Sequence, residues 1–320
     1  MTNYFTVTGM LETDITQAVE IWVDQNIRYC SKNSAFPDYW RNNTNEIEGF
    51  LRRKIQDKAA IVAKHDSKIF GYLAYDEFPF NGERSVFCPA VSHAVVEEHK
   101  EEGYLALYQR ISQEWVSRNI FNHMWTINFN DIQLRNILFD LGFGSYLIDA
   151  FARTDDGLDC NRSCVVKRAH ERDKEVLYEL IDESREYYRS APLFLRREQY
   201  SMEDVHAVIQ KSNVFMAWDK DSAIGFINVS ISQRNNVIDM SVKNCGLIDE
   251  IGVYIKPDYR GRGLGRELLK NVFDYCSGNG IQGVHVDFET ANLFANKFWR
   301  KYFSPMLLSV RRTINKNIND

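Results

Sequence analysis

The chain has 320 residues, of which 44% are hydrophobic, and its formal net charge is −5 at pH 7. This length suits two ordinary domains with buried cores, and the acidic balance excludes an overall basic field for nucleic acid or anionic membranes. No apolar run approaches the length of a membrane span, and the first residues lack the basic start of a signal peptide. We therefore expect a cytoplasmic protein without a nucleic-acid or membrane partner.

Hydrophobic periodicity predicts an ordered set of helices and strands in the first half of the chain. Residues 154–163 that follow are polar and lack periodicity, which is typical of a linker. The predicted helices cover residues 14–31 and 45–58, a segment starting at Tyr104, and 133–141. The predicted strands cover 59–64, 67–75 and 125–129.

The second half repeats this order at an offset of roughly 160 residues, as expected for a tandem duplication. Phe143 aligns with Phe303, and Ser117-Arg-Asn119 aligns with Ser277-Gly-Asn279. The predicted strands are 165–168, 214–218, 222–230, 245–255, 284–289 and 307–313. The predicted helices are one that runs through 176–181, one at 204–211, one whose apolar positions span 264–276, and one at 293–302.

The cysteines give no sign of a metal site. Six are scattered along the chain, and Cys160 and Cys164 form the one close pair. A zinc site needs a second pair or histidines at ligand spacing, and the nearest histidine is a lone His170. We therefore expect free thiols and no metal ion.

The most informative stretch is a strand, a glycine loop and a helix start in succession. The apolar strand Val253-Tyr254-Ile255 reaches a turn at Pro257, and glycines then stand at positions 261, 263 and 265 before a helical pattern. Glycines allow backbone N–H groups to approach an anion, and a helix N-terminus adds unpaired donors. The spacing fits neither the P-loop nor the dinucleotide-binding pattern.

Arg260, Gly263 and Gly265 match the pattern Arg/Gln-x-x-Gly-x-Gly/Ala. This resembles the pyrophosphate-binding loop of the GNAT superfamily of acyl-CoA-dependent N-acyltransferases. The resemblance implies an α/β (α+β) fold of two tandem GNAT-like domains, 1–155 and 156–320, each a mixed, mostly antiparallel twisted sheet flanked by helices. It implies that acetyl-CoA binds in the second domain, at Val253, Tyr254, Ile255, Arg260, Gly261, Arg262, Gly263, Leu264, Gly265, Arg266, Asn292 and Trp299.

The first domain departs from the pattern at the same place. There the sequence is Glu97-Glu-His-Lys-Glu-Glu-Gly103, with four carboxylates against one lysine and a single glycine. Such a segment would repel a pyrophosphate. We expect a degenerate copy that keeps the fold without CoA and serves as a packing partner or a wall of the acceptor pocket. A second ligand of its own is the alternative.

Acyl transfer to an amine needs a base, donors for the thioester oxygen and an acid for the departing thiolate. In the resembled family a backbone N–H of the strand before the glycine loop polarises the oxygen. Candidate bases are Asp249, Glu250, Asp287 and Glu289, which together favour a cationic acceptor. Because neighbours on a strand point to opposite faces, we expect only one of Asp249 and Glu250 to face the cleft.

The acid is where the sequence departs from the family. In Asn292-x-x-Ala-x-x-Phe-Trp299-x-x-Tyr302, tryptophan stands at the usual position of the proton-donating tyrosine. Indole has no proton to give at useful pH, so Trp299 is expected to pack. Three accounts stay open: the thiolate leaves unassisted, Tyr254 or Tyr302 replaces the acid, or CoA binds without turnover. Tyr187 and Tyr188 are placed to line the acceptor pocket or to join the core.

The sequence thus predicts an acetyl-CoA-dependent N-acetyltransferase acting on a primary amine, either a small molecule or a peptide amine, as a monomer or homodimer. A non-catalytic CoA-binding or regulatory protein is the first alternative. An aminoacyl-tRNA-dependent transferase is the second, and the acidic balance and intact glycine loop argue against it.

Overall fold

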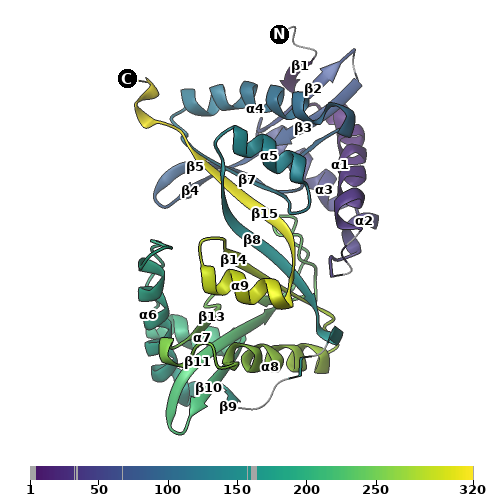
Figure 1. Ribbon diagram of the computed structural model, residues 1–320. Helices are drawn as coiled ribbons and strands as arrows, with labels where there is room; N and C mark the ends of the chain where they lie inside the picture. The colour runs from purple at the N-terminus through teal and green to yellow at the C-terminus, as the bar shows by residue number, and fades with distance from the viewer. Residues whose placement is uncertain are drawn as a thin grey trace. The chain divides into compact units, whose positions relative to one another are not determined.

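The computed structural model describes residues 5–31, 33, 35–66, 68–156, 158–159 and 164–319 (Figure 1). Cys160 and much of the predicted linker lie outside these residues. Two compact units are present, and each contains segments distant in sequence. The first unit comprises Met1–Asp149, Asn236–Ser241 and Pro305–Asp320, and the second comprises Ala150–Asn235 and Val242–Ser304. The domain boundary near residue 155 was predicted from the duplication in the sequence, and it stays a prediction.

The first unit contains two groups of strands and five helices among its described residues. One sheet has the order β1-β2-β3-β6, and the strands β4-β5-β7-β15-β8 follow one another in the other. The pairs β1–β2, β2–β3, β3–β6, β4–β5 and β7–β15 are antiparallel, and the pair β5–β7 is parallel. The elements are β1 (Thr6–Gly9), α1 (Ile15–Cys30), α2 (Tyr39–Asn42), α3 (Asn45–Gln56), β2 (Ala60–His65), β3 (Lys68–Ala74), β4 (Asp76–Phe80), β5 (Glu83–Cys88), β6 (His93–Val95), α4 (Lys100–Ser117), β7 (Asn122–Asn128), α5 (Ile132–Asp140), β8 (Gly144–Arg153) and β15 (Ser304–Thr313).

The second unit is built around a mixed, mostly antiparallel sheet. The strand order in this sheet is β8-β14-β12-β11-β10-β9, and the end of β8 belongs to the second unit. Strand β13 also pairs with β11. The pairs β9–β10, β10–β11, β11–β12 and β11–β13 are antiparallel, and the pair β12–β14 is parallel. Its own elements are β9 (Val165–Arg168), α6 (Lys174–Arg189), α7 (Met202–Lys211), β10 (Asn213–Asp219), β11 (Ser222–Ile231), β12 (Gly246–Ile248), β13 (Val253–Ile255), α8 (Leu264–Gly278), β14 (Gly283–Glu289) and α9 (Leu293–Tyr302).

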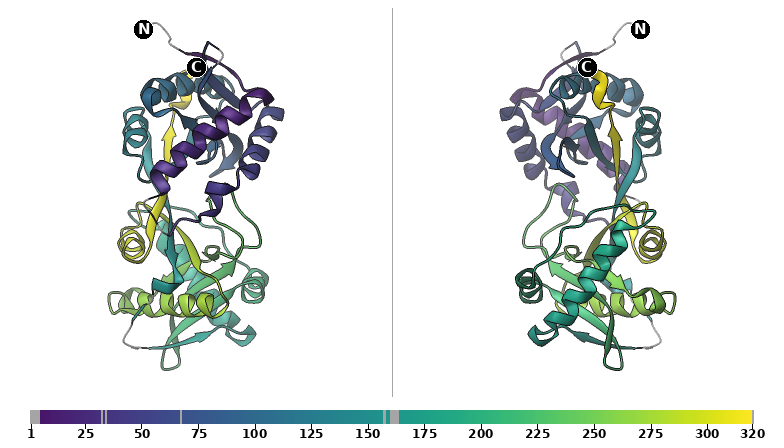
Figure 2. Two further views of the ribbon diagram at one scale, coloured as in Figure 1. Left: turned by 90° about the vertical axis from the view of Figure 1, so that its right-hand side faces the viewer. Right: turned by 90° about the vertical axis from the view of Figure 1, so that its left-hand side faces the viewer.

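Helices cover both faces of the second unit's sheet. Two opposed views show α6 nearest the viewer on one face and α8 on the other (Figure 2). The buried residues of α6, Leu177, Leu180, Ile181 and Ser184, recur at the spacing of one helix face. With β10, β11 and β13 they form a core that includes Phe226. The fold class predicted from the sequence is therefore confirmed.

Caps in the sequence determine where several helices begin. Asn292 accepts a hydrogen bond from the Ala295 N–H at 3.2 Å and starts α9 at the predicted residue. Asp131 caps α5 in the same way, through the Leu134 N–H at 3.0 Å. One predicted start was wrong: α4 begins at Lys100, four residues before Tyr104, because the 3₁₀ turn of Glu97–His99 leads directly into it.

Among the described residues, every helix falls short of the length and apolar character needed to cross a membrane.

Candidate active site

An opening between two strands of the second unit creates the site. Residues 245–255, predicted as one strand, are divided into β12 and β13 by a bulge at residues 249–252. The Gly252 N–H donates to the Asp249 carbonyl at 2.7 Å, and Glu250 has a φ of 57°. The parallel pairing of β12 with β14 ends at Ile248 and Val286, whereas β13 pairs with β11. The prediction of a continuous strand was wrong because the bulge ends the pairing with β14.

The bulge leaves backbone groups of β13 facing away from β11. In the antiparallel register, the Lys256 N–H donates to the Ile224 carbonyl at 2.9 Å, and the Asn228 N–H donates to the Gly252 carbonyl at 3.0 Å. Because such bonds alternate along a strand, Val253 and Ile255 direct their N–H groups to the opposite side, toward the opening. This is the side on which the family resemblance places the thioester oxygen and the pantetheine arm.

The glycine loop joins β13 to the N-terminus of α8. Gly261 and Gly263 have φ values of 76° and 88°, a region in which side chains are strained. An added Cβ at either glycine would meet no atom within 4 Å, so the backbone conformation rather than crowding favours glycine there. A Cβ at Gly265 would lie 3.0 Å from the Phe298 ring, so this glycine allows α8 to approach α9.

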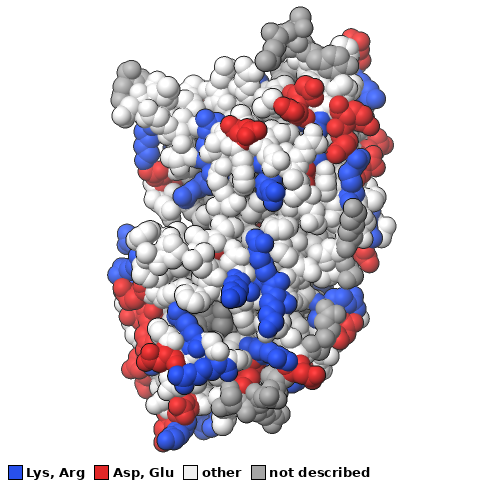
Figure 3. Space-filling view, viewed as in Figure 1, with Lys and Arg blue, Asp and Glu red and all other residues white. Residues whose placement is uncertain are grey.

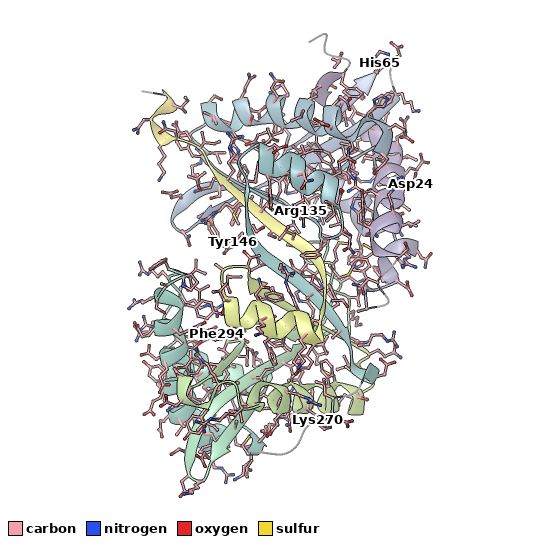
Figure 4. The ribbon with its side chains drawn as sticks, viewed as in Figure 1. Asp24, His65, Arg135, Tyr146, Lys270 and Phe294 are labelled. Atoms are coloured by element: carbon pink, nitrogen blue, oxygen red, sulfur yellow. The ribbon has the colours of Figure 1, made fainter. Side chains whose placement is uncertain are left out.

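Arg260 is held at the strand end by contacts from three elements. Its Nε donates to the Ile255 carbonyl at 2.8 Å. The guanidinium lies 4.6 Å from the ring centre of Tyr187 on α6, 5.6 Å from that of Tyr254 and 5.9 Å from that of Phe294. Phe294 stands at the end of α9 nearest α6 (Figure 4). These contacts leave the remaining guanidinium N–H groups able to bind an anion.

A cavity of about 1300 Å³ joins the loop to the strand opening, and all of its lining residues belong to the second unit. It brings together nearly all the residues predicted from the sequence. Arg262 does not line it; this side chain is exposed and lies over the Tyr259 ring. The predicted residues that line the cavity are Asp249, Glu250, Val253, Tyr254, Ile255, Arg260, Gly261, Gly263, Leu264, Gly265, Arg266, Asp287, Asn292, Trp299 and Tyr302.

The cavity fits the phosphate groups of CoA at its loop end. Arg266 Nε is buried and has no hydrogen-bond partner among the described residues, which leaves a cationic donor beside the glycines. Lys and Arg side chains also gather on the face that carries α8 and α9 (Figure 3). They include exposed Arg262, Lys297 and Arg300. A helix N-terminus with this surrounding charge favours a multiply charged anion.

The carboxylates lie at the other end of the strand opening. Asp249 and Glu250 both line the cavity, so the expectation that only one faces the cleft was wrong. The alternation rule fails because β12 ends at Ile248 and Glu250 has left-handed backbone geometry. Burial first, and then the charge of Asp249, raises the pKa of the Glu250 carboxyl, and Lys211 partly opposes this. Ser230 donates to Asp249 Oδ1 at 3.2 Å.

Trp299 is a packing residue, as predicted. Its side chain is buried against Phe298 and Phe303, with ring centres 4.9 and 5.2 Å away. Tyr254 and Tyr302 both line the cavity. Tyr254 donates to Glu183 Oε2 at 3.3 Å, and burial, followed by that carboxylate, raises the Tyr254 pKa to about 12.

One cluster of residues in contact, from a loop, a helix and a strand, was not predicted from the sequence. Arg197, in the segment between α6 and α7, stacks 3.7 Å from the ring centre of Tyr188. The same arginine forms an ion pair with Glu289 of β14 at 3.5 Å. Nothing in the local spacing indicates that these three residues meet. Glu289 does not line the cavity, which makes it a poorer candidate base than Glu250.

The corresponding part of the first unit is closed by its own side chains. His93 of β6 lies 3.0 Å from the Tyr104 hydroxyl and 2.9 Å from the Thr126 carbonyl of β7, and both contacts are buried. At the start of α4, Lys100 is fully buried and pairs with Asp131 at 2.7 Å. Side chains thus fill the space between β6 and β7. The cavity found near His93 measures about 20 Å³.

Residues 174–304 match the model of the Acetyltransferase (GNAT) family. This match encloses every residue that lines the large cavity of the second unit. Residues 174–304 are therefore similar in sequence to GNAT domains. No curated protein matches the chain.

Solved structures extend the likeness of fold to the whole chain. A GCN5-related N-acetyltransferase from Sphaerobacter thermophilus is 12% identical with a TM-score of 0.60, over 98% of this chain and 96% of that chain. A GCN5-related glucosamine N-acetyltransferase region in a fungal multi-domain GH3 β-N-acetylglucosaminidase is 11% identical with a TM-score of 0.57. That match covers 97% of this chain and 38% of that chain. At such identities the likeness concerns the fold. The chain thus has the fold of GNAT N-acyltransferases.

Proposed function

We propose that the second unit is an acetyl-CoA-dependent N-acetyltransferase that acts on a primary amine. The observation that carries this proposal is the continuity of the cavity from the glycine loop, through the opening between β13 and β14, to Asp249 and Glu250. CoA supplies the acetyl group as a thioester. Arg260, Arg266 and the N-terminus of α8 hold the phosphates in this proposal, and Asn292 supports the cofactor at the start of α9.

The chain's own groups supply the rest of the chemistry. Glu250 takes a proton from the incoming ammonium, and its raised pKa suits that role because a base works best near the operating pH. The N–H groups of β13 that face the opening hold the thioester oxygen. The amine nitrogen forms the new C–N bond as the C–S bond breaks. The sulfur leaves as a thiolate and takes a proton from a cavity tyrosine or from water, and the nitrogen returns its second proton to that group as the amide forms.

The first unit is proposed to bind no CoA. The support for this is the buried contact of His93 with Tyr104 and Thr126, together with the buried pair of Lys100 and Asp131. The proposed compartment is the cytoplasm, because the described cysteines are free thiols.

A CoA-binding protein without turnover is the second candidate, and the burial of Trp299 at the acid position favours it. Release of free thiol from acetyl-CoA, measured with a panel of amines, decides between the two. The panel includes polyamines, amino acids, aminoglycosides and short peptides. Thiol release with any amine, abolished in Glu250→Gln, supports the transferase. CoA binding by calorimetry without thiol release across the panel supports the second candidate.

A further inference from the structure

The acceptor end of the cavity carries charges of both signs. The acceptor end is the part of the cavity lined by α6, α7, the segment 197–200 and the bulge residues Asp249 and Glu250. A pocket for a simple polyamine needs only anions, because a cation would repel the second ammonium group. The acceptor end has in addition three cations, Arg185, Arg197 and Lys211. Arg185 is paired with Asp182 and Glu186 of its own helix, and Lys211 acts on Glu250.

Arg197 is fixed in place but retains unused donors. Its guanidinium stacks 3.7 Å from the Tyr188 ring centre and pairs with Glu289 at 3.5 Å, and 37% of its side chain is exposed. Within the part of the chain that the structure describes, Arg197 forms one ion pair, whereas a guanidinium has five N–H donors in a planar fork. Such a fork binds a carboxylate through two parallel hydrogen bonds. The stacked ring holds the fork in one orientation.

Tyr200 lines the cavity together with Arg197 and Glu250. Its pKa is raised first by burial and next by the negative charge of Glu250, and it is lowered in turn by the positive charge of Arg197. The charges of Glu250 and Arg197 therefore both act on one phenol that lines the cavity. An acceptor in this part of the cavity meets both carboxylates and a guanidinium.

We propose that the acceptor is a zwitterion of the amino-acid class, a molecule with a free amine and a free carboxylate. Its carboxylate binds the open edge of Arg197, and its ammonium lies against Glu250 and Asp249. This inference rests on the proposed acetyltransferase function and adds the identity of the acceptor's second charged group. It makes Arg197 the residue that determines specificity for the carboxylate.

The test compares matched acceptors that differ in one group. Thiol release from acetyl-CoA is measured with a set of amino acids, including some with the amine several carbons from the carboxylate. Each is paired with its carboxamide and with the amine that lacks the carboxylate. The wild-type chain is expected to give a kcat/KM at least about tenfold higher for the free acid, the size typical of losing one charge-assisted hydrogen bond.

Two variants assign that preference to the guanidinium. Arg197→Gln is expected to remove the preference through a higher KM for the free acid, with the carboxamide unchanged. Arg196→Gln is the matched control, because the neighbouring Arg196 is exposed and does not line the cavity. It is expected to behave as the wild type. A loss in Arg197→Gln that is equal for the acid and the carboxamide indicates a structural role and overturns the inference.

The outcomes separate this inference from the proposed function. Turnover of carboxamides or simple amines as fast as of the free acids overturns the inference and leaves the transferase in place. CoA binding without turnover of any acceptor contradicts the transferase, and the inference falls with it. A preference for free acids that survives Arg197→Gln places the carboxylate elsewhere and overturns the assignment to Arg197.

Discussion

Arg260 Nε donates a 2.8 Å hydrogen bond to the backbone carbonyl of Ile255, the last residue of β13. This bond connects the glycine loop to the strand that borders the cavity. It also turns one edge of the guanidinium toward the protein and leaves the other edge for a ligand. The loop and the strand opening are thereby held as one site.

Arg260→Lys is expected to lower the affinity for CoA about tenfold, equivalent to ~1.4 kcal/mol. Lysine keeps the charge but cannot hold the Ile255 carbonyl and an anion at once through a planar fork. Calorimetric titration with CoA measures the effect. Arg262→Lys, at an exposed position outside the cavity lining, serves as the control and is expected to change little. Equal losses in both variants contradict a special role for Arg260.

Gly263→Ala is expected to lower the free energy of unfolding by about 1–2 kcal/mol, because a side chain there is strained at a φ of 88°. Gly278→Ala lies at the other end of the same helix and has open space for a Cβ. It is expected to be neutral or slightly stabilising. Chemical denaturation of both variants checks this. An unchanged Gly263→Ala protein means that the loop is free to adopt another conformation.

The pH dependence of turnover reports on Glu250. A base must be deprotonated, so kcat/KM is expected to rise with pH through the pKa of Glu250, above the usual range of a glutamate. In Asp249→Asn this acidic limb is expected to move to lower pH, because a neighbouring negative charge is removed. In Lys211→Met it is expected to move to higher pH, because a positive charge is removed.

These two shifts must have opposite signs. Kinetics with one accepted amine, measured across the acidic range, provide the comparison. A limb that stays fixed in both variants assigns it to another group, and the base would then be a different residue or a water molecule.

Lys100→Met is expected to destabilise the first unit by about 3–5 kcal/mol, because Asp131 then remains buried without its cation. Adding Asp131→Asn is expected to recover part of the loss, since asparagine can keep the cap of α5 without a charge. Arg110→Met is the control; its pair with Glu114 is exposed and contributes little. Thermal unfolding of the three variants is the measurement. Equal melting temperatures for Lys100→Met and Arg110→Met contradict a stabilising buried pair.

Local patterns in the sequence predicted most helices and the loop of the site. The helix α9 begins and ends at the predicted residues, because Asn292 caps it and its apolar residues recur at helical spacing. The resemblance to GNAT enzymes correctly identified the fold. These features depend on residues close together in sequence, which is why they could be predicted.

Features that depend on tertiary contacts could not be predicted in this way. The bulge at residues 249–252, where Glu250 lines the cavity, ends the pairing with β14, and Gly252 is the one turn residue that its local sequence offers. Arg197 meets Glu289 across more than ninety residues of sequence. The pairing of β15 with β7, such as Val310 with Trp125, places the last strand in the first unit. Both strands mix apolar and polar residues, a pattern that fits many partners.

The central claim is that one CoA binds per chain, at the glycine loop of the second unit. The most direct measurement is a calorimetric titration of CoA into the wild-type chain and into the double variant Arg260→Glu with Gly263→Glu. The account predicts one molecule per chain for the wild type and a loss of at least about a hundredfold in affinity for the variant, ~2.7 kcal/mol. An unchanged affinity in the variant, or two molecules per wild-type chain, would contradict the claim.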